Sequence, residues 1–362
     1  MKSILYLFTI FTLVSCARTP EPKVAEAPKT PKNIILLIGD GMGLSQISVA
    51  QYQSKQTPNF ERFPVVGLSK TSSSQQLITD SAAGATAFAC GIKTYNGAIG
   101  VNDDTTHVAN LSEIFALRNI SSGVVATSSI THATPASFYA HAASRNYHED
   151  IAQDLANSNI TYFAGGGLQY FNARKDSLDL LPSLLAKGFT IDSTQLPAQA
   201  TDKMALLLAA NAMPTMLEGR GDFLSKSSEL GIACLSKNEN GFFLMIEGSQ
   251  IDWGGHDNDT QYLTTELLDF DATLGAVLDY AKQDGQTLVI VTADHETGGF
   301  TLSSDGSNYN NIVPSFSTSG HSGTMVPVFA FGPGSEDFGG IYENTAIFHK
   351  IMALMTDAKG LN

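Results

Sequence analysis

The chain has 362 residues, of which 43% are hydrophobic, and its formal net charge is -14. An acidic chain without a cluster of Lys and Arg is a poor partner for nucleic acid, although bound metal ions can still reverse the local field and admit an anionic substrate. Three cysteines make no disulfide framework, and the apolar neighbours of Cys90 and Cys234 indicate two buried thiols, with one bridge between them left open.

The N-terminus has the features of an export signal. Met1-Lys2 supplies a positive charge, and the apolar run Ile4–Val14 is too short to span a bilayer. The tetrad that ends at Cys16 resembles a bacterial lipobox, which predicts cleavage before Cys16 and lipidation of its sulfur. An ordinary cleavage site that precedes a cysteine is the alternative. Residues 16–32 are polar and contain four prolines, a composition typical of a tether.

We therefore expect three segments. Residues 1–15 are a lipoprotein-type signal peptide, 16–32 a lipid-anchored tether, and 33–362 the folded domain. The mature protein is then exported and held at the membrane through its N-terminal lipid, in the periplasm or at the cell envelope.

The folded domain opens with a buried strand and a loop. Asn33–Gly39 is a continuous aliphatic run, which is typical of a strand covered on both faces. It ends in Asp40-Gly41-Met42-Gly43, and we expect a helix from about Leu44.

A helix beginning at Ser81 is the next feature. Thr79, Asp80 and Ser81 are all N-cap types, and the residues that follow them are almost all small. Such a helix directs its free N–H groups and its positive dipole end at whatever Ser81 touches. A serine in this position suits attack on phosphorus or on a carbonyl carbon, although a well-capped buried helix is the simpler interpretation of this stretch alone.

Strands and helices alternate through the rest of the chain. We expect strands over Gly123–Thr127, Tyr162–Gly167, Gly241–Ile246, Thr287–Thr292 and Val326–Phe331. We expect helices over Asn110–Asn119, Thr131–Arg145, Leu178–Lys187, Asp202–Asn211, Thr264–Asp284 and Thr345–Met355. This alternation predicts an α/β fold in which a mainly parallel central sheet carries helices on both faces.

Polar residues gather where the strands end. Asp40, Glu247 and Asp294 each follow an aliphatic strand at its carboxyl end, the edge at which open α/β sheets bind ligands. Other potential metal ligands lie nearby in the sequence, namely Asp252, His256, His295 and His321. Imidazole and carboxylate ligands suit zinc, whereas an all-oxygen set that includes a threonine hydroxyl suits magnesium.

At this point the sequence resembles the alkaline phosphatase family. Thr-Asp-Ser-Ala-Ala at 79–83 matches that family's nucleophile motif, and Lys93–Gly97 matches its continuation. Six further segments match in the family's order, namely Asp40–Gly43, Ala133–Ala136, Ser144-Arg145, Glu247–His256, Thr292–His295 and Gly320-His321. The resemblance extends from about Asn33 to the C-terminus and is weak over 168–235.

The resemblance implies hydrolysis of phosphate monoesters to an alcohol and inorganic phosphate, through a phosphoserine on Ser81. Arg145 would bind two phosphoryl oxygens with its planar guanidinium. The resemblance also implies two zinc ions and one magnesium ion. One zinc ion would be held by Asp252, His256 and His321, and the other by Asp40, Asp294 and His295. The magnesium ion would be held by Asp40, Thr134 and Glu247. Three dications and Arg145 against four carboxylates leave three positive charges, which a monoester dianion and a serine alkoxide would neutralise.

Two positions depart from the family's best-known bacterial pattern. His132 stands where many members have aspartate, and Trp253 where they have lysine or histidine. Because both positions are next to expected ligands, these changes are expected to weaken the binding of magnesium and of phosphate. The interval between Phe300 and His321 is short, which predicts a small crown insertion or none. Family members are usually homodimers, so a homodimer is a possible assembly.

Three other functions compete with this interpretation. A sulfatase of the same superfamily needs a modifiable Cys or Ser followed two residues later by proline, and residue 83 is Ala. A phosphodiesterase more often uses a threonine nucleophile and lacks the counterpart of Arg145. A non-catalytic metal- or phosphate-binding lipoprotein would require neither Ser81 nor Arg145.

Overall fold

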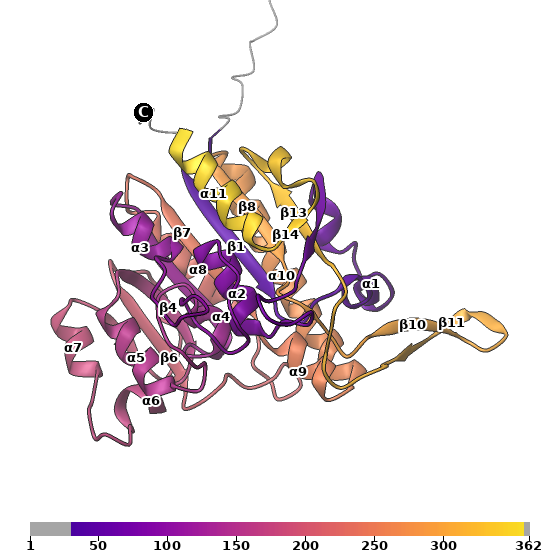
Figure 1. The fold of residues 1–362 in the computed structure, drawn as a ribbon, viewed down its shortest axis with the longest axis horizontal. Helices are drawn as coiled ribbons and strands as arrows, with labels where there is room; N and C mark the ends of the chain where they lie inside the picture. Colours follow the sequence, from indigo (N-terminus) through magenta and orange to yellow (C-terminus); the bar gives the residue numbers. More distant parts are fainter. Residues whose placement is uncertain (1–29, 358–362) are drawn as a thin grey trace, which may run out of the picture.

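The computed structural model describes residues 30–357, so the signal peptide and Cys16 lie outside the described residues, as does the tether up to residue 29. Its centre is a ten-stranded sheet in the order β14-β2-β13-β8-β1-β7-β3-β4-β6-β5 (Figure 1). These strands are β1 Asn33–Gly39, β2 Val65–Lys70, β3 Ser121–Ser129, β4 Ile160–Gly166, β5 Thr190–Asp192, β6 Met204–Ala209, β7 Phe242–Gly248, β8 Thr287–Thr292, β13 Val326–Phe331 and β14 Gly340–Glu343. Strand β13 runs antiparallel to β8 and β2, and the other pairings are parallel.

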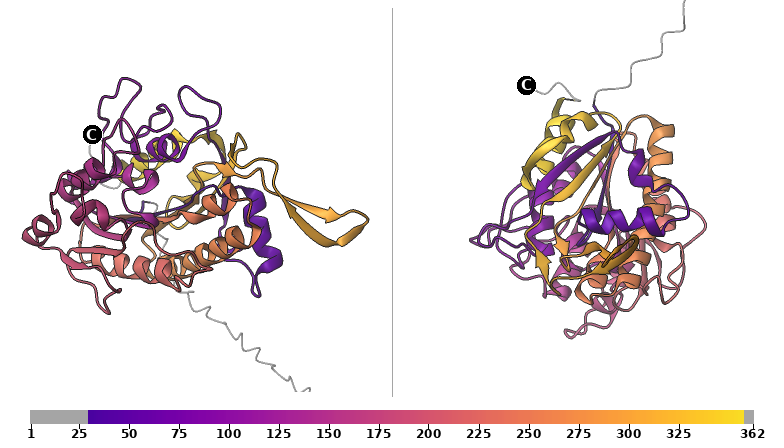
Figure 2. Two further views of the ribbon diagram at one scale, coloured as in Figure 1. Left: turned by 90° about the horizontal axis from the view of Figure 1, so that it is seen from below. Right: turned by 90° about the vertical axis from the view of Figure 1, so that its right-hand side faces the viewer.

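Helices cover both faces of the sheet, as the alternation predicts (Figure 2). They are α1 Leu44–Gln53, α2 Ser81–Cys90, α3 Leu111–Ala116, α4 Ala133–Ala136, α5 His148–Asn157, α6 Gln169–Asn172, α7 Leu181–Ala186, α8 Phe223–Leu235, α9 Gln250–His256, α10 Thr260–Asp284 and α11 Thr345–Asp357, with short 3-10 turns at Asn59–Arg62 and Ser335–Phe338. No helix among residues 30–357 has the length and apolar character that crossing a membrane requires.

The central strand β1 shows why both faces are covered. Ile34, Leu36 and Ile38 pack into a core with α2, α3, α5 and α11, while Ile35 and Leu37 pack into a second core with α1, α8, α9 and α10. Successive side chains of a strand point to opposite faces, so an all-aliphatic strand needs a helical layer on each side. The two helical layers do not cover the carboxyl edge of the parallel strands, and the loops lie at that edge.

A two-stranded hairpin extends from the body between Phe300 and His321. Its strands are β10 Thr301–Asp305 and β11 Asn308–Ser315, and they reach well beyond the rest of the molecule in Figure 1 and in the left view of Figure 2. At its base the short strands β9 Glu296–Thr297 and β12 His321–Ser322 pair with each other. The expected crown insertion is thus a small one.

Two predicted helices were wrong. Residues 202–211 contain strand β6 instead, because a six-residue apolar run buried in a sheet has no periodicity that separates it from a helix. Of the helix predicted over Thr131–Arg145 only α4 forms, because Ala142 pairs with Ile99 and the Arg145 N–H donates to the Gly97 carbonyl at 2.8 Å. Strand β2 and helices α5 and α8 were not predicted.

Candidate metal centre

Ser81 begins helix α2. The Asp80 carboxylate caps the helix by accepting a hydrogen bond from the Ala83 N–H at 3.0 Å. The small residues of α2 allow close packing, since a Cβ at Gly84 would lie only 3.0 Å from the Cβ of Asp294. The predicted cap is confirmed, and together with the close packing it brings the Ser81 hydroxyl to the edge of the sheet.

Three buried carboxylates line that edge. Asp40 follows β1, Glu247 lies at the end of β7 and Asp294 follows β8, and all three side chains are fully buried. Strand β1 is paired with both β7 and β8, with Ile38 opposite Glu247 and Thr292. The register of three neighbouring strands therefore places the three carboxylates next to one another.

His295 joins Ser81 to two of these carboxylates. Its Nε2 atom lies 3.3 Å from Ser81 Oγ, 3.3 Å from Asp294 Oδ2 and 3.5 Å from Asp40 Oδ1. Its Nδ1 atom lies 3.2 Å from Thr297 Oγ1, and that hydroxyl donates its proton to Asp252 Oδ1 at 2.5 Å. Thr297 Oγ1 must then accept from Nδ1–H, so His295 Nε2 presents a lone pair to oxygens that also carry lone pairs.

Lone pairs also face one another around Asp252. His256 Nε2 and His321 Nε2 lie 3.1 Å apart, and they are 3.4 and 3.6 Å from Asp252 Oδ1. Each ring donates Nδ1–H to a backbone carbonyl, that of Ser319 at 2.7 Å for His256 and that of Thr79 at 2.8 Å for His321. In the neutral rings the two Nε2 lone pairs therefore face each other and a carboxylate, an arrangement that a cation between them would relieve.

A third group surrounds Glu247. Asp40, His132 and Glu247 offer ligand atoms that lie within 4.8 Å of one another, and Thr134 is next to Glu247. Glu247 Oε2 accepts hydrogen bonds from Ser249 at 2.6 Å and Ser128 at 3.3 Å, whereas Oε1 is not hydrogen-bonded within the described part of the chain.

Buried polar atoms without partners converge on the same space. Within residues 30–357, hydrogen-bond partners are missing for both carboxylate oxygens of Asp40, for Asp294 Oδ2, Glu247 Oε1, Thr134 Oγ1 and His132 Nδ1. Burial raises the pKa of Asp40, of Asp294 and of Glu247, the last to about 7, and it lowers that of His295. Leaving such groups unpaired is costly in a folded protein, so the donor set fits bound cations.

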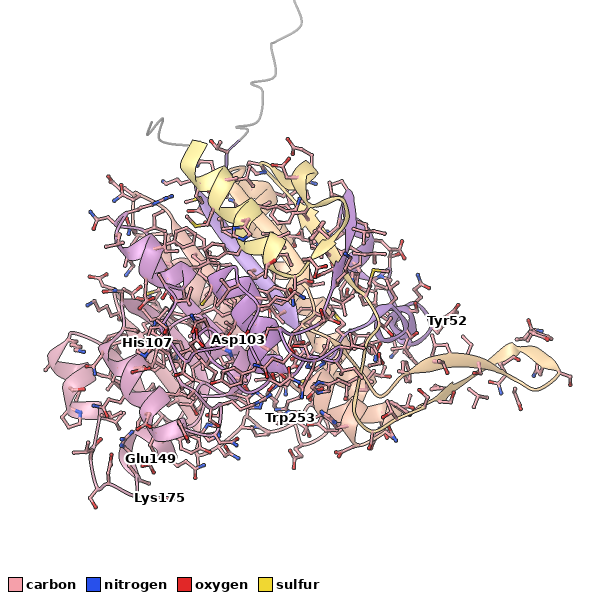
Figure 3. All side chains as sticks on the ribbon, in the orientation of Figure 1. Tyr52, Asp103, His107, Glu149, Lys175 and Trp253 are labelled. Atoms are coloured by element: carbon pink, nitrogen blue, oxygen red, sulfur yellow. The ribbon has the colours of Figure 1, made fainter. Side chains whose placement is uncertain are left out.

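Arg145 stands beside this centre. Its NH1 donates to Asp80 Oδ2 at 2.9 Å, and its NH2 lies 3.2 Å from His132 Nε2. Burial and the guanidinium charge lower the pKa of His132 to about 3, so this ring is neutral. The ring of Trp253 meets that of His132 edge-on at 5.9 Å, and Figure 3 shows Trp253 at the lower rim of the molecule, toward which β1 runs.

The predicted catalytic and metal-binding residues, together with His132 and Trp253, lie in this one region, whereas Cys16 lies outside the described residues. The structure adds two that the sequence reasoning did not assign to the site, Asp80 as the partner of Arg145 and Thr297 as the link between His295 and Asp252. Thr297 lies two residues after a predicted ligand, but its role depends on side-chain geometry that the sequence pattern does not contain. Cys90 and Cys234 are free and buried, so the bridge left open above is excluded.

The comparisons with known proteins agree on one family. Residues 31–315 match the family model described as alkaline phosphatase. Alkaline phosphatase 3 of Bacillus subtilis is 33% identical over 93% of this chain and 92% of its own length. The structure of alkaline phosphatase from the Antarctic bacterium TAB5 is 58% identical with a TM-score of 0.89, covering 91% of this chain and 99% of that one. A cold-active alkaline phosphatase from a psychrophilic Shewanella species is 30% identical with a TM-score of 0.83, covering 89% and 99%.

Proposed function

The chain belongs to the alkaline phosphatase family, and we propose that it hydrolyses phosphate monoesters through a phosphoserine on Ser81, with two zinc ions and one magnesium ion. The observation that carries the proposal is the set of three imidazole Nε2 lone pairs, on His256, His295 and His321, that face carboxylate oxygens. Such a set is stable only around cations, and imidazole with carboxylate is the ligand chemistry of zinc.

The proposed ligand sets follow the three groups of side chains. Asp252, His256 and His321 hold one zinc ion, and Asp40, Asp294 and His295 hold the other. Asp40, Thr134 and Glu247 hold magnesium, because hydroxyl and carboxylate oxygens are its preferred ligands. A solved variant of the TAB5 enzyme, with aspartate in place of a histidine, is described with magnesium bound in its M3 site. This supports a weaker magnesium site here, where His132 lies beside Asp40 and Glu247.

The reaction needs few groups from the chain. Bound metal ions would supply Lewis acidity, which favours the deprotonated serine and stabilises negative charge on the leaving oxygen. Ser81 Oγ forms a bond to phosphorus as the ester P–O bond breaks, and water later cleaves the phosphoserine to release phosphate. Arg145 binds two phosphoryl oxygens with its fork of N–H donors while Asp80 holds the guanidinium in place. The N-terminus of α2 adds its positive dipole end beside Ser81.

The competing functions fit the site less well. Storage of metal or phosphate requires neither a serine at a helix start nor an arginine held by a carboxylate, and both are present. Ala83 lacks the proline of a sulfatase motif. A diesterase remains the closest rival, and we separate it from a monoesterase by experiment below.

We further propose an exported homodimer anchored by a lipid on Cys16. The exposed hairpin β10–β11 supports the dimer, because an isolated two-stranded hairpin is marginal in water and gains stability from a covering surface. Tyr309 near its turn is 85% exposed. Sedimentation of the parent and of a chain with the hairpin shortened would test this assembly.

The central test is turnover of a chromogenic phosphate monoester before and after exhaustive chelation. We expect activity to be lost on chelation and restored by zinc with magnesium, and a chromogenic diester to be a far poorer substrate. Full activity in the chelated protein would refute the mechanism. Faster diester than monoester turnover would favour the diesterase.

A further inference from the structure

Glu296 is a buried acidic residue for which the mechanism above has no role. It follows His295 directly and is only 5% exposed. Its Oε1 accepts hydrogen bonds from Gln46 Nε2 at 2.7 Å and from the Phe300 N–H at 3.0 Å, and its Oε2 accepts one from the Ser322 hydroxyl. Among residues 30–357 we find no ion pair for it, so these three donors, all neutral, satisfy the carboxylate.

The three donors come from different parts of the fold. Gln46 belongs to α1 and is fully buried, and the same Nε2 also donates to the Thr297 carbonyl at 2.9 Å. Phe300 precedes the hairpin strand β10, and Ser322 belongs to β12, where it stands opposite Glu296 and next to His321. The Glu296 carboxylate thus joins helix α1 to the segments that precede and follow the β10–β11 hairpin.

Glu296 also contacts the Asp40 loop itself. A Cβ at Gly43 would lie 2.5 Å from Glu296 Cγ, so the stem of this side chain runs directly against the backbone at the end of Asp40–Gly43. This contact explains why residue 43, the last of that motif, is a glycine. Its lack of a side chain leaves room for Glu296.

The position of His321 depends on such a link. Between Thr297 and His321 the chain leaves the body through the hairpin and returns. The two-residue pairing of β9 with β12 reconnects it, together with the Gly298 N–H that donates to the Gly320 carbonyl at 2.9 Å and the His321 Nδ1–H that donates to the Thr79 carbonyl at 2.8 Å. His256, on the other side of the same group, is partly exposed. Asp40 and Asp294, by contrast, lie one and two residues after strands of the main sheet. The Asp252–His256–His321 group is therefore the one whose geometry needs a brace.

We propose that Glu296 is a positioning residue that holds the His321 strand against the Asp40 loop and His295, and so sets the spacing of the two zinc positions. The inference rests on the proposed function, since it assumes that both groups bind zinc. Removing an outer partner of a metal ligand typically weakens metal binding about 10- to 100-fold. We expect a loss of that size at the Asp252–His256–His321 site in E296A, with the affinity of the other site retained.

The test is zinc binding measured by competition with a chromogenic chelator, without reference to activity. The H321A variant identifies which of the two affinities belongs to the His321 site. S322A removes the link between Glu296 and β12, together with the contact of the Ser322 hydroxyl with Thr324 Oγ1 at 2.9 Å, and should reproduce the loss seen in E296A. E296Q should stay close to the parent, because its amide can still accept from Gln46 and Phe300 and meet the Ser322 hydroxyl. S303A is the matched control, because Ser303 is an exposed serine of the hairpin strand β10, between the two ends that Glu296 joins.

Each outcome decides the question. Selective loss at the His321 site in E296A and S322A, with E296Q and S303A like the parent, supports the inference. It is overturned if E296A binds both zinc ions as tightly as the parent, or if E296A weakens both sites equally while S322A changes neither. Should E296A fail to fold, the comparison of S322A with S303A decides alone. A parent that binds no zinc overturns the proposed function, and this inference with it.

Discussion

Replacing Arg145 by alanine tests how the site holds phosphate. The Arg145 side chain is only 24% exposed and its guanidinium is held by Asp80 at 2.9 Å, so solvent screens its contacts incompletely. A charge-assisted hydrogen-bonding contact is worth about 1.5–3 kcal/mol, which corresponds to roughly a 10- to 150-fold loss in affinity. We expect R145A to fall in the upper part of this range, because the Asp80 carboxylate then loses its cation and repels the phosphoryl group.

The assay is kcat/KM for a chromogenic monoester and for a diester, together with the inhibition constant of inorganic phosphate. Monoester turnover and phosphate binding should fall much more than diester turnover, because the diester carries one negative charge fewer. R145K separates charge from geometry, since lysine keeps the cation and loses the planar pair of donors. Adding D80N to R145A should recover part of the loss. Equal losses for monoester and diester would show that Arg145 does not bind the phosphoryl oxygens.

Three further predictions follow from the site and the N-terminus. S81A keeps the Asp80 cap of α2, so we expect an unchanged melting temperature but no acid-stable phosphoenzyme, and undiminished monoester turnover would refute the role of Ser81. The parent's activity should rise with added magnesium, and inorganic phosphate should inhibit it only mildly. The double variant His132→Asp with Trp253→Lys should bind magnesium and phosphate more tightly. If parent and variant show the same magnesium dependence and the same phosphate inhibition, these two positions are structural. Cys16→Ser should abolish lipidation, which intact-mass spectrometry of membrane-extracted protein detects, and an unmodified terminus elsewhere in the parent would refute the anchor.

The parts of the fold that could be predicted are those with a repeated physical pattern. The aliphatic strands β1, β7, β8 and β13 and the long amphipathic helix α10 have periodicities that few other structures share. Strand β6 was mistaken for a helix because burial on both faces removes its alternation. The segment after Thr131 did not continue as a helix because its backbone pairs with the loop at Ile99, a contact that no local pattern reveals.

The clustering of the proposed ligands could be predicted because they lie at or just after the ends of recognisable strands, or within motifs. Asp40 and Asp294 are placed by the register of β1 with its neighbours, which a strand assignment already implies. Thr297 and Glu296 were not assigned because their roles depend on which atom of a neighbour faces them. A hydroxyl shared between His295 and Asp252 is a matter of side-chain geometry, and one-dimensional spacing does not contain it.

The charge balance of the site also changes once its neighbours are known. Counting three dications and Arg145 against four carboxylates leaves three positive charges, enough to neutralise a monoester dianion and a serine alkoxide. Asp80 adds a negative charge 2.9 Å from Arg145, and His132 is neutral, so the loaded site carries one negative charge instead of none. The attraction for phosphate must then come chiefly from the proposed metal ions, because Asp80 already balances the guanidinium. In the proposed mechanism Arg145 contributes the direction of its two donors, and the residual negative charge would favour departure of the phosphate product.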